Sequence, residues 1–301
     1  MASIISKEIE NEIIKVHGEY SPVYQKVTTD IKKKYPSALN LPLDKIAQVQ
    51  SYKSGWNIES DEIEVVVIGA GGTGGYLIRD LARFIYSVEQ RIQARTKLSM
   101  VIVDGDIVET KNVLRQNFLQ QDVGQNKAEV LANRHTRAFG VNISYVPEMY
   151  SYDNVMSFRR IVEGNKKRIF VGCVDNNEAR RQIAKSVAEC WNGYGVTQNC
   201  FWIDSGNERK SGQVIVGNKD LMDVSDLYPE ILLPKYDSVE QVSCADRMLQ
   251  DEQNMFVNLT ASNLILNYVK NIILDLPMIT HGSVFNIDNK FDNYYIKQKG
   301  L

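Results

Sequence analysis

From about residue 62 onward, two hydrophobic patterns alternate along the chain. Short apolar runs of five to nine residues are typical of strands buried on both faces of a parallel sheet. Longer stretches carry apolar residues at helical spacing on one face. The predicted strands cover 64–68, 98–104, 141–146 and 167–175, and the predicted helices cover 74–95, 126–139 and a stretch from about 178. This alternation predicts a Rossmann-like α/β fold: a doubly wound, mainly parallel sheet that binds its ligand at the carboxyl ends of its strands.

The C-terminal third departs from this alternation. Residues 200–204 and 212–216 read as two strands around a Gly-containing turn, and we expect both to extend the sheet in an antiparallel sense. Residues 228–247 carry turn residues and little periodicity, which predicts a long loop. The apolar stripe from Ile265 to Leu276 then predicts a core-packing helix, and His281 begins a further strand in which it has a turn or core role.

The first 60 residues differ in composition from the rest. They contain three of the seven prolines and no arginine, since the first arginine of the chain is Arg79. Two short patterns there are typical of helices, and the lysine run 32–34 predicts a solvent-exposed surface. We therefore predict an N-terminal extension of unknown role over 1–60, followed by the main domain over 61–301.

Composition narrows the class of protein. Hydrophobic residues make up 44% and charged residues 24% of the 301 residues, which is typical of a globular protein. The formal net charge is -2 without a long basic stripe, so nucleic acid is disfavoured as a main partner. Charged residues interrupt 1–16, and Asn and Lys interrupt 255–276, so neither a secretory signal nor a membrane span is predicted. We expect a cytoplasmic protein.

The cysteines and histidines form no metal-binding pattern. Cys173, Cys190, Cys200 and Cys244 lie far apart without a CxxC pair, which argues against a zinc ribbon. The first three fall in strand or helix contexts and are expected to be structural. The three histidines lie far apart in the sequence and form no cluster.

A glycine-rich segment follows the first predicted strand. Residues 69–75 read GAGGTGG and include Gly69, Gly71, Gly72, Thr73 and Gly74. Glycines at this position let backbone N–H groups approach a phosphate, and the following helix directs its positive end at that charge. The pattern alone fits NAD, FAD, ATP or a turn without a ligand.

Polar residues at the next strand ends favour a nucleoside triphosphate. Asp104 ends the second strand, 35 positions after Gly69, and the segment that follows carries Asp106, Asn112, Arg115 and Gln116. Lys127 begins the next helix and Asp175 ends the fourth strand. Cationic Arg and Lys side chains can spread the charge of a triphosphate. Mg²⁺ prefers one or two carboxylates together with phosphate oxygens, so Asp175 is the expected ligand. Each residue alone could be a cap, a surface ion pair or a turn former.

In these residues the chain resembles the ThiF/MoeB/ubiquitin-activating-enzyme superfamily. That family shows the patterns GxGGxGS, DxDxVxxSNLxRQ, dxGxxK and (T/V)DN in this order. The corresponding segments here are GAGGTGG at 69–75, DGDIVETKNVLRQ at 104–116, DVGQNK at 122–127 and VDN at 174–176. The resemblance covers roughly 62–290. It is greatest to the ThiF-related proteins of the PRTRC plasmid cassette, on segments such as 203–207, 212–217 and 256–258.

The resemblance implies an ATP- and Mg²⁺-dependent adenylyltransferase that activates the C-terminal carboxylate of a ubiquitin-like or sulfur-carrier protein. It implies that Asp104 binds the ribose hydroxyls, that Asn112, Arg115 and Lys127 contact the phosphates, and that Asp175 holds Mg²⁺. The glycine loop would lie under the nucleotide. Cys244 matches the position of a cysteine that takes the acyl group in many members, and a buried structural thiol is the alternative. A homodimer is expected from the resemblance only.

Two features depart from the family pattern, and other functions stay open. Dimeric relatives supply an arginine from a helix before the first strand of the opposite subunit, and 1–60 contain none. Either Lys45 or another lysine replaces it, or this contact between subunits is missing. The paired CxxC motifs of many members are also missing. The alternatives are ATP-dependent activation of a tRNA base, which the near-neutral charge disfavours, a non-catalytic regulatory subunit, and a nicotinamide oxidoreductase, which the spacing to Asp104 disfavours.

Overall fold

The computed structural model describes residues 51–59, 61–92, 97–152, 166–192, 200–233, 255–288 and 290–295. The chain divides into two compact units, Met1–Ser51 and Tyr52–Leu301, and every element named below belongs to the second unit. The predicted extension over 1–60 lies mostly outside the described residues, so its role and its boundary stay predictions.

Strands and helices alternate through the first half of the second unit, as the hydrophobic pattern predicts. The strands are β1 (Glu62–Ile68), β2 (Lys97–Val103), β3 (Ile143–Val146), β4 (Lys167–Gly172), β5 (Cys200–Asn207), β6 (Ser211–Gly217), β7 (Thr280–Asn286) and β8 (Lys290–Tyr295). The helices are α4 (Gly72–Ile92), α5 (Thr110–Val113), α6 (Lys127–Phe139), α8 (Asn177–Asn192), α9 (Val224–Leu227) and α11 (Met255–Ile273), with 3₁₀ turns η2 (Gln120–Asp122) and η4 (Pro229–Leu232).

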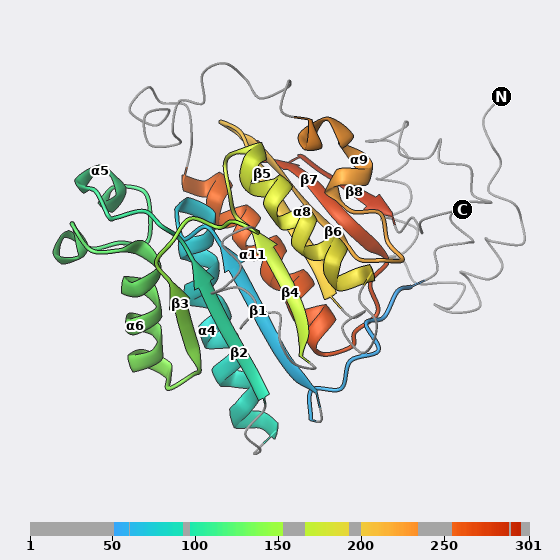
Figure 1. Cartoon of the computed structure of the whole chain (residues 1–301), viewed down its shortest axis with the longest axis horizontal. Helices are drawn as coiled ribbons and strands as arrows, with labels where there is room; N and C mark the ends of the chain where they lie inside the picture. Colours follow the sequence, from blue (N-terminus) through green and yellow to red (C-terminus); the bar gives the residue numbers. More distant parts are fainter. Residues whose placement is uncertain are drawn as a thin grey trace, which may run out of the picture. The chain divides into compact units, whose positions relative to one another are not determined.

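All eight described strands form one sheet in the order β3-β2-β1-β4-β5-β6-β7-β8. The pairs from β3 to β5 are parallel, and the pairs from β5 to β8 are antiparallel. Strand β1 lies inside the sheet, β2 and β3 follow on one side of it, and the chain then returns to add β4 on the other side of β1 (Figure 1). This confirms the predicted Rossmann-like, mainly parallel sheet with an antiparallel C-terminal extension.

The strand at Cys200–Asn207 corrects one detail of that prediction. It pairs in parallel with β4, with Gly172 opposite Asp204, so the antiparallel part begins only at β6. The physical reason is the length of the connections. Helix α8 provides the long crossover that returns the chain for another parallel strand, whereas only residues 208–210 join β5 to β6, which permits a hairpin and nothing else.

Helices cover both faces of the sheet. Helices α4, α6 and α11 pack with one set of strand side chains into the larger hydrophobic cluster, and α8 packs with the opposite set into a second cluster (Figure 1). Neighbouring residues of β1 illustrate the alternation, since Val65 and Val67 belong to the first cluster while Val66 and Ile68 belong to the second. All four are at most 1% exposed, because a central parallel strand is covered on both sides.

Residues before β1 also pack on this core. Trp56 is buried, and its ring lies 5.4 Å from the ring of Phe201 in an edge-to-face arrangement. Tyr52 bridges to Met278, which precedes β7, and its ring is 6.1 Å from that of Phe201. The main unit therefore starts several residues before its first strand. Among the described residues, no helix is long and apolar enough to cross a membrane.

Candidate functional site

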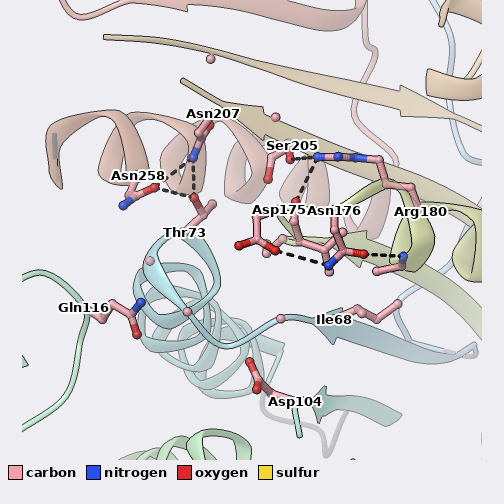
Figure 2. A pocket seen from close by; sticks show the side chains of 18 of the residues that line it. Ile68, Thr73, Asp104, Gln116, Asp175, Asn176, Arg180, Ser205, Asn207 and Asn258 are labelled. Atoms are coloured by element: carbon pink, nitrogen blue, oxygen red, sulfur yellow. Dashed lines mark hydrogen bonds between the residues drawn. The ribbon is translucent and has the colours of Figure 1, made fainter. Parts of the chain in front are cut away.

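A cavity of about 960 Å³ lies at the carboxyl ends of β1, β2, β4 and β5 (Figure 2). The crevice outside the strand ends, where the chain changes direction in the sheet, is the usual ligand site of such folds. Most residues that the sequence singled out line this cavity: Gly69, Gly71, Gly72, Thr73, Asp104, Asp106, Asn112, Arg115, Gln116, Lys127 and Asp175. Gly74 is not among the residues that line the cavity. Cys244 and Lys45 lie outside the described residues.

The glycine loop closes tightly on itself between β1 and α4. Gly69 has a φ of 93°, in the region that favours glycine, and a Cβ there would lie 2.5 Å from the carbonyl oxygen of Cys173. A Cβ on Gly74 would lie only 1.9 Å from the carbonyl oxygen of Gly69. The space freed by these glycines brings the backbone N–H groups at the start of α4 to the cavity, where they can bind an anion.

Asp104 holds this loop against the end of β2. Its Oδ2 atom accepts a hydrogen bond from the backbone N–H of Ala70 at 2.6 Å, and its Oδ1 atom accepts one from Asp106 at 2.8 Å. Burial raises the pKa of the Asp104 carboxyl, and the nearby charge of Lys127 opposes that rise. The residue therefore fixes the mouth of the cavity, and its predicted contact with a ribose stays a prediction.

The segment after β2 forms a wall of the cavity next to the glycine loop. Asn112 is buried, and its side chain accepts a hydrogen bond from the backbone of Glu109 at 2.8 Å, which caps α5. Arg115 is also buried and lines the cavity. Gln116 is 9% exposed, and its Oε1 atom has no hydrogen-bond partner within the described part of the chain. Such an orphaned buried acceptor fits a ligand that brings a donor into the cavity.

Lys127 forms an ion pair on the same wall. Its Nζ atom lies 2.7 Å from Oδ2 of Asp106, and its side chain is only 8% exposed while that of Asp106 is 48% exposed. Asn126 places the lysine, because its side chain caps α6 by accepting a hydrogen bond from Glu129 at 3.0 Å. A phosphate that binds Lys127 would therefore have to replace a carboxylate as its partner.

Asp175 lies just beyond β4, and its side chain is exposed. The amide of Asn176 donates to Oδ1 of Asp175 at 3.3 Å, and the side-chain oxygen of Asn176 caps α8 at Ala179. No group of three or more His, Cys, Asp or Glu side chains that could hold a metal occurs among the residues described. The donor set at Asp175 fits a cation that takes most of its ligands from a bound phosphate chain, as Mg²⁺ does.

A network of polar side chains that joins the glycine loop, β5 and α11 beside the cavity was not predicted from the sequence. Asn207 of β5 donates to Oγ1 of Thr73 at 2.7 Å and to Oδ1 of Asn258 at 3.0 Å, and Thr73 donates to the same Asn258 oxygen at 3.1 Å (Figure 2). Asn207 and Asn258 lie in segments that the resemblance included, but nothing local gave them a role. Arg180, which binds Asp204 beside this network, was missed as well.

Acidic side chains outnumber basic ones around the cavity. Its lining contains the carboxylates of Asp104, Asp106, Glu109, Asp175, Glu178 and Glu208 against the cations of Arg115, Lys127 and Arg180. With six acidic and three basic groups, the lining would repel a triphosphate that arrived without a counterion. The balance fits a nucleotide that is bound together with a divalent cation.

None of the three described cysteines is both accessible and easily ionised. Cys173 lines the cavity, but burial raises the pKa of its thiol to about 12, so it is protonated at neutral pH. Cys190 and Cys200 are both buried in the second hydrophobic cluster. Cys244 lies outside the described residues, and its role as an acyl acceptor stays a prediction.

A comparison with protein-family models matches residues 58–295 of the chain to the model described as ThiF family. The chain belongs to the ThiF family. The finer resemblance to the PRTRC-cassette proteins stays a prediction.

Curated relatives of this ThiF-family chain are ubiquitin-like-protein activating enzymes. It is 24% identical over 195 residues to ubiquitin-like modifier-activating enzyme 5 of Dictyostelium discoideum, which is 60% of this chain and 46% of that protein. It is 33% identical over 125 residues to the NEDD8-activating enzyme E1 catalytic subunit of Arabidopsis thaliana, covering 41% of this chain and 24% of the relative. The chain thus spans less than half the length of either relative.

Solved structures share the fold. The crystal structure of E. coli MccB with ATP aligns with a TM-score of 0.53 at 17% identity, over 79% of this chain and 64% of MccB. The structure of PaaA aligns with a TM-score of 0.55 at 16% identity, over 80% of this chain and 74% of PaaA. At these identities the likeness establishes the fold of the ThiF domain.

Proposed function

We propose that this ThiF-family chain is an ATP-dependent adenylyltransferase that activates the C-terminal carboxylate of a small ubiquitin-like or sulfur-carrier protein. The observation that carries the proposal is the convergence of Asp104, Arg115, Lys127 and Asp175 around one glycine loop in one cavity. Membership of the ThiF family supports it. So do the names of relatives that activate ubiquitin-like modifiers, and the MccB structure that was solved with ATP.

The reaction transfers the adenylyl group to a carboxylate. A carboxylate oxygen attacks the α-phosphorus of ATP, a new P–O bond forms, and the bond from that phosphorus to the bridging oxygen breaks, so pyrophosphate leaves with the electron pair. The product is an acyl-adenylate. Since a carboxylate is already ionised at neutral pH, no base is needed to remove a proton, and catalysis rests on alignment and charge neutralisation.

The residues of the cavity divide this work. The glycine loop and the start of α4 bind phosphate oxygens through backbone N–H groups, because Gly69 and Gly74 let the loop pack closely against backbone carbonyl groups and turn sharply into the helix. Arg115 and Lys127 neutralise charge on the phosphates, with Lys127 exchanging Asp106 for a phosphate oxygen. Gln116 accepts a hydrogen bond from the nucleotide or the carrier at its orphaned Oε1 atom.

Asp175 would hold a Mg²⁺ ion together with phosphate oxygens. When bound, that ion would offset the negative balance of the cavity and neutralise charge on the leaving pyrophosphate. The chain's own part is to keep the Asp175 carboxylate exposed at the end of β4, next to the cavity.

The cavity also has room for the second reactant. It continues past the glycine loop along β5 and β6, where Gly206, Asn207, Gly212 and Gln213 line it. We propose that the C-terminal tail of the carrier protein enters on this side. A homodimer and a place in the PRTRC cassette complete the proposal, and both rest on the resemblance alone. A cytoplasmic location is proposed from the sequence, which predicts neither a secretory signal nor a membrane span.

Cys244 would take the activated acyl group in a second step. Its thiolate would attack the carbonyl carbon of the acyl-adenylate, a thioester would form, and AMP would leave. Cys244→Ala should then spare adenylation and abolish any adduct that a reducing agent removes. An adduct that persists in this variant would show that another residue carries it.

The decisive measurement is ATP–pyrophosphate exchange, with and without candidate carrier proteins. We expect carrier-dependent exchange in the wild-type protein and its loss in Asp175→Ala, because the carboxylate that holds the cation is removed. Wild-type exchange rates in Asp175→Ala would contradict the site assignment.

Negative results would separate the alternatives. ATP binding without exchange for any carrier would favour a non-catalytic, regulatory ThiF-like subunit. A gel shift with bulk tRNA would favour a tRNA-modifying enzyme, against the expectation from the near-neutral net charge.

A further inference from the structure

Arg180 joins α8 to β5 and to the segment after β4 at the edge of the cavity. It lies in the first turn of α8, and its Nε atom donates to Oδ2 of Asp204 at 3.0 Å. Its Nη2 atom donates to the backbone carbonyl oxygens of Val174 at 3.0 Å and Ser205 at 3.1 Å. Figure 2 shows the side chain reaching from α8 towards the ends of β4 and β5.

The stability of α8 does not account for this placement. A positive charge in the first turn of a helix opposes the helix dipole, whereas the acidic Glu178 in the same turn suits it. The pair with Asp204 is also deeply buried, with side chains 13% and 3% exposed, and a buried ion pair is weak grounds for a gain in stability.

The guanidinium is not available as a phosphate ligand either. An arginine carries five N–H donors. Nε binds Asp204, both hydrogens of Nη2 are directed at the carbonyls of Val174 and Ser205, and Nη1 contacts Oδ1 of Asn177 at 3.3 Å. At most one N–H is left for a ligand.

The peptide group that Arg180 holds comes directly before Asp175. The ladder between β4 and β5 ends at Gly172, and residues 173–176 have no regular structure. Beyond that point the carbonyl of Val174 is fixed by Arg180, and the side chain of Asn176 is fixed by capping α8. The exposed carboxylate of Asp175 lies between these two anchors.

We infer that Arg180 is a positioning residue for Asp175: by binding the carbonyl of Val174 it sets the direction in which the Asp175 carboxylate meets a nucleotide-bound divalent cation. The inference rests on the proposed function and adds a residue to it. The planar fork of an arginine can bind a carboxylate and two carbonyls at once, which a lysine ammonium on its flexible stem does not reproduce. A displaced carboxylate then holds the cation less well.

The test compares Arg180→Lys with Arg181→Lys as the matched control. Arg181 is the next residue of α8, its side chain is 10% exposed, and it binds Glu178 and the carbonyl of Ile231 instead of the end of β4. Binding of Mn²⁺ is followed by electron paramagnetic resonance in the presence of a non-hydrolysable ATP analogue. We expect Arg180→Lys to weaken Mn²⁺ binding at least fivefold and Arg181→Lys to leave it within twofold of wild type.

Two further variants separate positioning from folding. Asp204→Asn removes the anion but leaves the bonds of Arg180 to the carbonyls, so it should lower thermal stability and keep Mn²⁺ affinity near wild type. In an Asp175→Asn background, Arg180→Lys should cause no further loss of Mn²⁺ affinity. In exchange assays, Arg180→Lys should need a higher Mg²⁺ concentration for half-maximal rate.

Three outcomes would overturn the inference: wild-type Mn²⁺ affinity in Arg180→Lys, an equal loss in Arg181→Lys, or an equal loss in Asp204→Asn. If the wild-type protein binds Mn²⁺ and the ATP analogue together but gives no exchange with any carrier, the proposed reaction is wrong. The positioning role of Arg180 is then decided by the Mn²⁺-binding data alone. The two failures are therefore distinguishable.

Discussion

Replacing Gly74 with alanine tests how the glycine loop is built. The added Cβ would lie 1.9 Å from the carbonyl oxygen of Gly69 and 2.9 Å from its carbonyl carbon. Since non-bonded heavy atoms prefer about 3.5 Å, the peptide of Gly69 has to move by roughly 1.5 Å. Overpacking of this kind lowers the free energy of unfolding by about 1–3 kcal/mol. The higher helix propensity of alanine raises it by up to about 1 kcal/mol.

We therefore expect Gly74→Ala to lower the free energy of unfolding by about 1–2 kcal/mol. It should also weaken ATP binding at least tenfold, because the displaced peptide carries the loop on which the phosphates rest. Urea unfolding measures the first quantity, and isothermal titration calorimetry with Mg²⁺ and ATP measures the second.

Gly75→Ala is the matched control in the same turn of α4. A Cβ on Gly75 would meet its nearest neighbours, the carbonyl oxygen of Ala70 and Cβ of Asn117, at 3.4 Å, which is ordinary contact. This variant should keep ATP affinity and gain up to about 1 kcal/mol in stability. The reasoning is refuted if Gly74→Ala binds ATP as tightly as Gly75→Ala and unfolds at the same urea concentration.

Two further predictions follow from shifted pKa values. The pKa of Cys173 is about 12, so its alkylation by iodoacetamide at pH 8 should be roughly a thousandfold slower in the folded protein than in the unfolded chain. Peptide mass spectrometry measures the extent of alkylation at Cys173. Rapid labelling of the native protein would contradict the burial of this thiol. The same shift makes stability fall as pH rises from about 9 towards 12, because the unfolded chain releases the thiol proton first. Burial, aided by the charges of Arg134 and Arg79, lowers the pKa of His135 to about 4, so stability should fall as pH drops from about 6.5 towards 4. His135→Leu should flatten that part of a urea-unfolding pH profile, and an unchanged slope would show that other groups cause it.

The frame of the site could be predicted because its signals are local. The apolar run before Gly69 predicts a strand, and the glycines that follow predict a tight turn into a helix, all within a few residues of each other. Asp104, Lys127 and Asp175 were assigned to strand or helix ends from the same hydrophobic pattern, and the structure places all three around one cavity. Parallel topology then brings these ends to the same edge of the sheet.

The supporting contacts could not be predicted because they join segments that are far apart in the sequence. The hydrogen bond between Thr73 and Asn258 spans 185 positions, and no local pattern distinguishes that asparagine from others in α11. Arg180 looks like any polar residue of an amphipathic helix until the ends of β4 and β5 are placed beside it. The pairing of Lys127 with Asp106 depends on how the segment between them folds back.

The packing of α11 has a consequence for synthesis on the ribosome. Residues 255–273 cover α4, which is made almost 200 positions earlier, and β7 completes its pairing with β6 only after residue 280. During translation the side of α4 that packs against α11 therefore stays uncovered until most of the chain has emerged. Such late, long-range closure slows folding and exposes hydrophobic surface to aggregation. Nascent chains halted before residue 255 should therefore depend on chaperones, and nucleotide binding should begin only near the end of translation.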